Sequence, residues 1–337
     1  MKIAIVNVNE AITAHGGVRI QGVMWAEGLR KLGHVCDLVD FWQNYDWKSY
    51  DAVIVLGYGG FVRNFCRGIR PICKKLVLAP IIDPTCSTKV FKFFTKYWGA
   101  HKRTGLTTKY HDLYLAAKEC DLFLARSEFE ALYIHKCLDV EKEKIKLVPL
   151  SIRTNILNEL PKKENFVLHV SRLASENKNV QRLIQSAIKF DIPLKLAGFL
   201  NGKEEEKWLF DLIGSHKNIE YLGVLSDSEL EVWYKRAKVF ALPSTNEGVG
   251  MVALEAAGYG CEIVLTNLGA PKEYFDGMAR LVNPYSIDDI GYAMRTSLAE
   301  GFSQPKLLRF VATHYSLESC SNLLINVLNL KSATYRV

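Results

Sequence analysis

The sequence predicts an α/β protein of two domains. Short apolar runs with the length of buried strands alternate with segments whose apolar residues recur at helical spacing. This rhythm is interrupted by a polar stretch within Ser151 to Asn165 and restarts with Phe166–Val170. A chain of 337 residues with 49% hydrophobic residues is also longer than one small core organises. We expect one domain over 1–155, a second over 156–315 and a C-terminal helix within 316–337.

The strands and helices follow from local patterns. In the first half, the expected strands are Lys2–Asn7, Val35–Asp40, Ala52–Leu56, Leu76–Ile82, Leu122–Ala125 and Ile145–Pro149. In the second half, they are Phe166–Val170, Asn218–Gly223, Val239–Leu242 and Glu262–Leu265. The clearest helices are Val18–Leu32, Val180–Lys189 and a segment from Met251 that ends at two glycines, Gly258 and Gly260. The periodicity of the C-terminal segment fits either a core helix or one that returns to the first domain.

Several protein classes are disfavoured by the sequence. It contains no run of eighteen apolar residues, and its N-terminus resembles a strand more than a signal peptide, so we expect a cytoplasmic protein. The eight cysteines include no C-x-x-C pair, which favours reduced thiols over a zinc site or a disulfide framework. The sequence lacks the dinucleotide-binding motif G-x-G-x-x-G, which argues against a nicotinamide-dependent dehydrogenase.

The most informative stretch runs from Val239 to Pro284. A buried strand ends at Pro243 and is followed by a glycine loop and a helix, with Glu247 and Glu255 separated by seven residues. In a helix they would lie roughly 12 Å apart, farther than the two carboxyls of a glycosidase. We therefore expect them to contact different parts of one long ligand, with the helix N-terminus meeting a phosphate between them. A nucleotide-sugar has this shape.

This stretch is similar to the donor-site signature of the retaining glycosyltransferase family 4, whose members have the glycosyltransferase B fold. The matching pieces are Pro243-Ser244, Glu247-Gly248-x-Gly250, the spacing to Glu255, and the later Gly269 and Glu273. Cys261-Glu262 departs from the small residue and proline that are usual after this helix. The resemblance implies two Rossmann-like domains that face each other across a cleft.

The resemblance also implies roles for individual residues. Glu247 would hold the donor sugar and Glu255 the ribose hydroxyls, while Arg172 and Lys178 would bind the diphosphate and stabilise its charge as it leaves. Ser171 stands where the family usually has glycine. The other donor-binding residues implied by the resemblance are Gly16, Gly17, Leu222, Gly223, Val224, Gly248, Val249, Gly250 and Met251.

The acceptor side departs from the family pattern. Where many members carry a histidine after the fourth strand, this chain reads Ile81-Ile82-Asp83-Pro84. Asp83 either takes that catalytic role or only starts a turn before Pro84. His101 and His111 are alternatives, each also explained as a surface histidine.

We therefore expect a retaining hexosyltransferase that needs no metal or cofactor, because no Asp-x-Asp occurs and the cations can neutralise the diphosphate. Its donor would be a nucleotide-sugar, with UDP as the expected nucleotide. Its acceptor would be a glycan or a lipid-linked glycan, as in cell-surface polysaccharide synthesis. The alternatives are a nucleotide-sugar 2-epimerase and a catalytically silent nucleotide-sugar-binding protein.

One segment, residues 61–118, is strongly basic. It contains twelve lysines and arginines against two acidic residues, Asp83 and Asp112, whereas the whole chain has a net charge of only +7. Aromatic residues alternate with Lys89, Lys92 and Lys96 in this segment. This composition suits an anionic membrane surface, which would place the protein peripherally on the cytoplasmic face. A solvated basic face over core aromatics is the alternative. Nucleic-acid binding is disfavoured because no recognised module is present.

Overall fold

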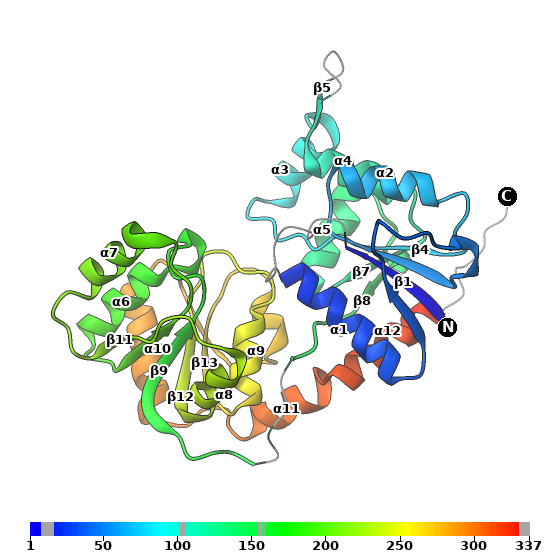
Figure 1. The fold of residues 1–337 in the computed structure, drawn as a ribbon. Helices are drawn as coiled ribbons and strands as arrows, with labels where there is room; N and C mark the ends of the chain where they lie inside the picture. Colours follow the sequence, from blue (N-terminus) through cyan, green and yellow to red (C-terminus); the bar gives the residue numbers. More distant parts are fainter. Residues whose placement is uncertain (8–16, 102–105, 154–156, 158, 330–337) are drawn as a thin grey trace. The chain divides into compact units, whose positions relative to one another are not determined.

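The computed structural model describes residues 1–7, 17–101, 106–153, 157 and 159–329. The chain folds as two compact units (Figure 1). Residues 1–151 form the first unit together with the segment that begins at Leu317, and residues 152–316 form the second. Each unit has its own six-stranded parallel sheet with helices, so the predicted α/β class is confirmed.

The first sheet has the strand order β2-β1-β3-β4-β7-β8. These strands are β1 (Lys2–Asn7), β2 (Val35–Leu38), β3 (Ala52–Leu56), β4 (Leu76–Ala79), β7 (Leu122–Ala125) and β8 (Ile145–Leu147). The helices are α1 (Gly17–Lys31), α2 (Gly60–Ile69), α3 (Thr88–Lys92), α4 (Lys109–Ala117), α5 (Glu128–Leu138) and α12 (Leu317–Asn329). Short helical turns lie at η1 (Trp47–Ser49) and η3 (Lys142–Lys144). A π-helical turn, η2 (Phe93–Tyr97), leads into a small hairpin of β5 (Ala100–His101) and β6 (Leu106–Thr107).

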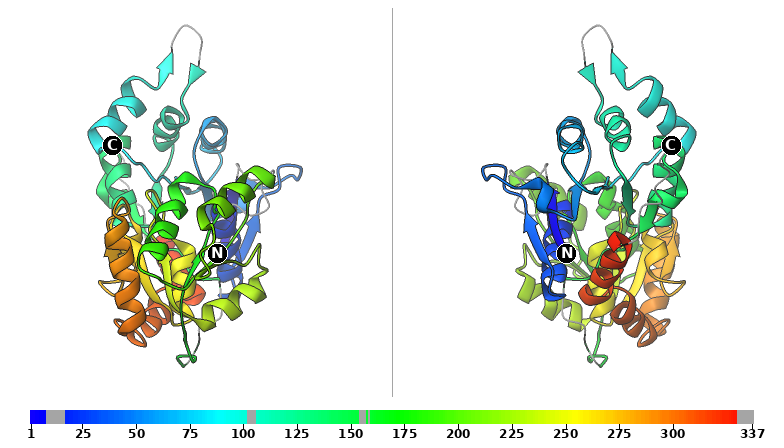
Figure 2. Two further views of the ribbon diagram at one scale, coloured as in Figure 1. Left: turned by 90° about the vertical axis from the view of Figure 1, so that its left-hand side faces the viewer. Right: turned by 90° about the vertical axis from the view of Figure 1, so that its right-hand side faces the viewer.

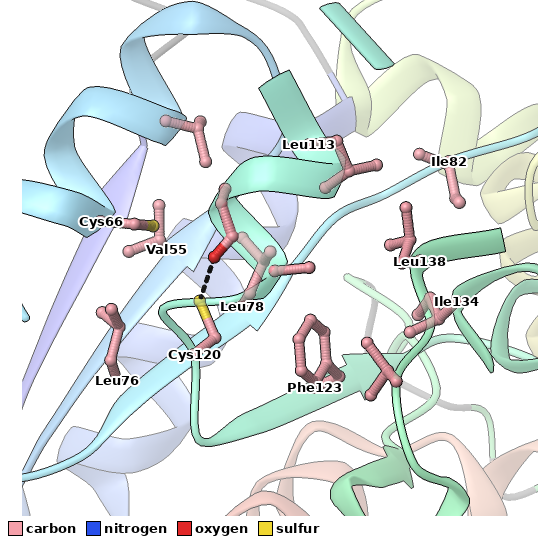
Figure 3. Packing of buried hydrophobic residues seen from close by; sticks show 14 of the residues in the cluster. Val55, Cys66, Leu76, Leu78, Ile82, Leu113, Cys120, Phe123, Ile134 and Leu138 are labelled. Atoms are coloured by element: carbon pink, nitrogen blue, oxygen red, sulfur yellow. Dashed lines mark hydrogen bonds between the residues drawn. The ribbon is translucent and has the colours of Figure 1, made fainter. Parts of the chain in front are cut away.

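Apolar side chains cover both faces of this sheet. On one face, Val55 and Phe123 of the strands pack with Leu113 of α4 and Ile134 of α5 (Figure 3). Beside them the Cys120 thiol donates a hydrogen bond to the carbonyl of Ala116. On the other face, residues of α1 and α12 share a cluster with the strands, among them Trp25, Leu29, Leu324, Val327 and Leu328. The C-terminal helix therefore packs within the first unit.

The second sheet has the order β11-β10-β9-β12-β13-β14. Its strands are β9 (Glu164–Val170), β10 (Leu194–Ala197), β11 (Ile219–Tyr221), β12 (Ala237–Leu242), β13 (Glu262–Thr266) and β14 (Arg280–Val282). Its helices are α6 (Val180–Lys189), α7 (Gly202–Ile213), α8 (Asp227–Arg236), α9 (Met251–Gly258), α10 (Ile287–Ala299) and α11 (Lys306–His314), with short turns η4 (Glu176–Lys178) and η5 (Pro271–Tyr274). The strands β10 and β14 are additions to the sequence prediction.

Glu262 at the start of β13 has a structural role. Its buried carboxylate accepts hydrogen bonds from the backbone N–H groups of Phe302, Ser303 and Gln304, and also from the Ser303 hydroxyl. These donors satisfy a charge that burial would otherwise penalise. Glu262, where this chain departs from the family pattern, thus anchors the segment that precedes α11.

The strand order defines where a ligand would bind in the second unit. The chain adds β10 and β11 on one side of β9, and then adds β12, β13 and β14 on the other side. In open parallel sheets, ligands bind outside the carboxyl ends of the strands at such a switch point. In the second unit this point lies between β9 and β12, which pair directly.

Candidate donor and acceptor sites

The turns after β9 and β12 are tied together by hydrogen bonds. The Asn179 amide nitrogen donates to the carbonyl of Pro243 at 2.9 Å and to that of Pro284 at 2.6 Å. The Thr245 N–H donates to the carbonyl of Asn177 at 2.9 Å. These bonds hold the two turns in register at the switch point, so side chains from both of them are pre-positioned.

Lys178 and Glu247 meet at this point. The Lys178 ammonium donates to the Glu247 carboxylate at 2.6 Å, and the Ser244 hydroxyl donates to the same oxygen at 3.1 Å. The two charged side chains are 21% and 13% exposed, so they remain reachable by a ligand while being largely shielded from water. The structure thus brings two predicted donor-site residues into direct contact.

Two further groups beside the Lys178–Glu247 pair could bind an anion. Arg172 lies in the turn after β9, is exposed, and forms no ion pair within the described ranges. Gly250 precedes α9 with a left-handed backbone (φ of 75°), and no side chain caps this helix start. The N–H groups of the first turn of α9 therefore point toward the loop that carries Glu247, which favours negative charge there.

His169 and Ser171 form a second arrangement at the end of β9. The Nδ1 of His169 lies 2.8 Å from the carbonyl of Ala241, and its Nε2 lies 2.7 Å from the Ser171 hydroxyl. Burial, with a smaller contribution from the nearby Lys178 charge, lowers the pKa of His169 to about 4. Since a carbonyl only accepts, Nδ1 carries the proton and Nε2 accepts from Ser171. The Ser171 oxygen therefore presents only lone pairs to a ligand.

Glu255 lies in the second turn of α9 and is buried, with 2% of its side chain exposed. The Arg153 guanidinium donates to it at 2.5 Å. Burial raises the pKa of Glu255, and the Arg153 charge opposes that rise. A ribose hydroxyl bound to Glu255 would therefore lie beside the Arg153 guanidinium on the same carboxylate. Arg153 is not among the residues predicted from the sequence, although it falls within the polar stretch between the two domains, where a basic residue has no core position to fill.

The other predicted donor residues are dispersed. Leu222, Gly223 and Val224 follow the edge strand β11, and the Gly223 carbonyl accepts a hydrogen bond from the Gly198 N–H after β10. Gly248, Val249 and Met251 surround the start of α9, with Val249 buried. Gly17 begins α1 in the first unit, and Gly16 lies outside the described residues.

On the acceptor side, Asp83 follows β4 and pairs with Arg126, which follows the neighbouring strand β7. The contact distance is 2.7 Å, and Arg126 is itself held by the buried Glu130 at 2.9 Å. Two residues before Asp83, Ile81 has a φ of 55°, which is a strained conformation for a β-branched residue. Such strain persists where surrounding contacts impose it, often at functional positions.

The alternative histidines are placed differently. His111 on α4 has its Nδ1 within 2.9 Å of the Thr95 carbonyl, so the ring is tied to the backbone of η2. His101 is exposed in β5. Of the three acceptor-side candidates, only Asp83 lies in the segment that leaves the carboxyl end of a strand of the parallel sheet, four residues after the end of β4.

Residues 154–310 match the family model for glycosyl transferases group 1. The chain is 26% identical over 184 residues to the O-antigen chain mannosyltransferase B of Escherichia coli, covering 50% of this chain and 46% of that protein. It is 29% identical over 161 residues to the MMP alpha-(1->4)-mannosyltransferase of Mycolicibacterium hassiacum, covering 45% and 39%. The chain thus spans less than half the length of these relatives in the matched regions.

Among solved structures, the sucrose-phosphate synthase of Thermosynechococcus elongatus matches with a TM-score of 0.73 at 14% identity, covering 97% of this chain and 98% of that one. The lipopolysaccharide outer core galactosyltransferase WaaB matches with a TM-score of 0.67 at 18% identity, covering 97% and 99%. The fold is that of the glycosyltransferase B class. The predicted resemblance to glycosyltransferases of this class is confirmed, and the narrower assignment to family 4 stays a prediction.

Proposed function

We propose that this protein is a retaining glycosyltransferase that moves a hexose-type sugar from a nucleotide-sugar to a glycan or lipid-linked acceptor. The observation that carries the proposal is the Lys178–Glu247 pair at the switch point of the second sheet. This pair lies inside the segment that matches glycosyl transferases group 1. A sugar bound to Glu247 would have its phosphate beside Lys178, Arg172 and the start of α9.

In the proposed reaction, the bond between the anomeric carbon and the diphosphate oxygen breaks. The leaving diphosphate keeps the electron pair, and Lys178 and Arg172 stabilise the charge that it gains. The acceptor hydroxyl attacks from the same face and transfers its proton to the leaving phosphate, so the anomeric configuration is retained. Neither a metal nor a cofactor is needed, because the two cations and the helix N-terminus neutralise the diphosphate.

The acceptor proposal draws on the relatives. One matching protein is named an O-antigen chain mannosyltransferase, which supports a polysaccharide acceptor and a mannose-type sugar for this chain. We propose that Asp83, held by Arg126, faces the acceptor hydroxyl. UDP-linked sugars are the first donors to test, with GDP-mannose beside them. The reaction would take place in the cytoplasm or at the cytoplasmic face of a membrane.

The test begins with a thermal-shift screen against nucleotide-sugars, since a ligand that binds only the folded state raises the melting temperature. Hits are then incubated with glycan acceptors, and the anomeric configuration of the product is read by NMR. Transfer with retention supports the proposal. Epimerised nucleotide-sugar in the absence of acceptor would indicate a 2-epimerase, and tight binding with no turnover across the acceptor panel would indicate a silent binding protein.

A further inference from the structure

The first unit carries a group of exposed apolar side chains, most of them aromatic, here called the aromatic surface. It consists of Val90 of α3, Phe93, Phe94 and Tyr97 of η2, Trp98 just after η2, and Leu106 of β6. Trp98 is 70% exposed and Tyr97 is 66% exposed. The Phe93 ring lies 5.5 Å from the Phe94 ring and 6.1 Å from that of Trp98, so these side chains form one patch. Contiguous exposed apolar patches of this kind mark interaction sites.

The segment that carries the aromatic surface is firmly anchored. Phe91 points inward and packs edge-on against Tyr110 and Tyr133, with ring centroids 4.9 and 5.5 Å apart. Thr95 is fully buried, and its carbonyl contacts His111. The exposed aromatics thus occupy the outward side of a segment whose other side belongs to the core. In Figure 2 the hairpin next to it extends away from the body of the first unit.

A basic hollow adjoins the aromatic surface. It has a volume of about 590 Å³, and its lining includes Lys89 and Lys92 of α3, Lys136 of α5, Asp139 and Glu141. Lys92 contacts Asp139 at 3.1 Å, and Lys96 pairs with the same carboxylate. Lys89, Lys92, Lys96 and Lys136 together outnumber the two acidic groups, so this region keeps positive charge after its ion pairs are counted.

We propose that the first unit docks on an anionic membrane, with the aromatic surface at the headgroup boundary and lipid phosphates beside the basic hollow. Amphipathic aromatic side chains next to lysines suit that boundary, and each lysine near an anionic leaflet strengthens binding about fivefold. Charge also argues against a second copy of this chain as the partner of this surface. A symmetric contact between two copies would bring their lysines together. The excess of basic residues over 61–118 agrees with the same partner.

The test is sedimentation of the whole protein with vesicles of pure phosphatidylcholine and with vesicles that also contain phosphatidylglycerol. We expect pelleting only with the anionic vesicles, and less pelleting as salt is raised. Lys89→Glu should weaken binding about tenfold or more, because it replaces an attraction by a repulsion. Trp98→Ala should weaken binding by a similar factor. Binding to pure phosphatidylcholine at equal strength would overturn the proposal.

Matched control variants distinguish binding through this surface from non-specific binding of the protein to vesicles. Trp42→Ala removes an even more exposed tryptophan of the first unit, and Lys203→Glu reverses an exposed lysine of the second, so both should bind like the unchanged protein. Quenching of tryptophan fluorescence by brominated lipids should be lost in Trp98→Phe and kept in Trp42→Phe. Equal losses in controls and test variants would overturn the proposal. So would a dimer that Trp98→Ala converts to a monomer without any change in vesicle binding.

Discussion

Glu247 receives two hydrogen bonds on one carboxylate oxygen, Oε2, one from Lys178 at 2.6 Å and one from Ser244 at 3.1 Å. Its other oxygen, Oε1, has no partner among the residues that the structure describes. The carboxylate is therefore oriented by the protein and keeps one oxygen for a ligand. Such an arrangement suits a residue that holds a sugar hydroxyl next to a phosphate bound by Lys178.

The first prediction concerns this pair and its neighbour Arg172. Glu247→Ala and Arg172→Ala should each reduce sugar transfer by on the order of 100-fold, because each removes a charged group from the proposed transition state. Arg172→Ala should keep a melting temperature close to that of the unchanged protein, because Arg172 is exposed. Initial rates of transfer provide the measurement.

Glu176→Ala is the matched control for these variants. Glu176 lies in the same turn after β9, is exposed, and forms no ion pair within the described part of the chain. Its removal should leave transfer within about twofold of the unchanged rate, as expected for a surface charge away from the reaction. If Glu247→Ala and Arg172→Ala transfer sugar as fast as Glu176→Ala, the donor-site assignment is wrong.

The second prediction is an acid-sensitive contribution from His169. Its pKa is about 4 in the folded protein and 6.5 as the ordinary value, so the unfolded chain binds the proton more readily. Stability from this group is therefore present above pH 6.5 and is lost as pH falls toward 4, by about 3 kcal/mol in total. His169→Gln should show a shallower loss of unfolding free energy over that range.

Denaturant titrations at several pH values provide the measurement. The difference in stability between the unchanged protein and His169→Gln should shrink as pH is lowered. The exposed His216 serves as the control, and His216→Gln should follow the unchanged protein at every pH. Parallel curves for the unchanged protein and His169→Gln would show that His169 is not buried in its neutral form.

The donor site was predictable from sequence to the extent that it lies in continuous motifs. The strand before Pro243 and the helix after Gly250 predicted where Glu247 lies, because parallel strands share one carboxyl edge. Contacts between distant segments were beyond such reasoning. The pairing of Glu255 with Arg153 joins residues 102 positions apart, and no local pattern encodes it.

Two strands of the second sheet were also missed for physical reasons. β10 (Leu194–Ala197) and β14 (Arg280–Val282) are four and three residues long, and each contains a charged residue, so their apolar runs are too short to stand out. The basic segment over 61–118 illustrates a similar limit. Its charge was readable from the sequence, whereas the division between the buried Phe91 and the exposed Phe93 and Phe94 depends on the packing of η2.

The third prediction concerns the acceptor side. Asp83→Asn should reduce transfer while leaving nucleotide-sugar binding unchanged, because Asp83 belongs to the first unit and donor binding is proposed for the second. Arg126→Met should instead lower stability by about 3 kcal/mol, since it removes the guanidinium that pairs with the buried Glu130 carboxylate and leaves only backbone N–H donors to that charge among the described residues. Transfer assays and thermal melts distinguish the two effects. Unchanged transfer in Asp83→Asn would mean that this residue only shapes the turn.

The fourth prediction concerns the Arg153–Glu255 pair. Arg153→Met should lower the unfolding free energy by about 2 kcal/mol at neutral pH, because Glu255 is buried and loses its only counter-charge in the described structure. This is below the usual cost of breaking a buried pair, since Arg153 is 31% exposed. Nucleotide binding should survive if ribose hydroxyls take the place of Arg153 on Glu255.

The raised pKa of Glu255 determines how the stability difference between the unchanged protein and Arg153→Met changes with pH. Burial raises the pKa of Glu255, so the folded protein holds its proton more tightly than the unfolded chain, and stability falls as pH rises through the folded value. Without Arg153 that pKa rises further, and the loss of stability extends toward neutral pH. The gap between the unchanged protein and Arg153→Met should therefore widen from acidic to neutral pH. The gap between Glu255→Gln and the double variant Arg153→Met with Glu255→Gln should stay constant with pH, because neither protein has a carboxyl at position 255. A constant gap between the unchanged protein and Arg153→Met would exclude a buried charge at Glu255.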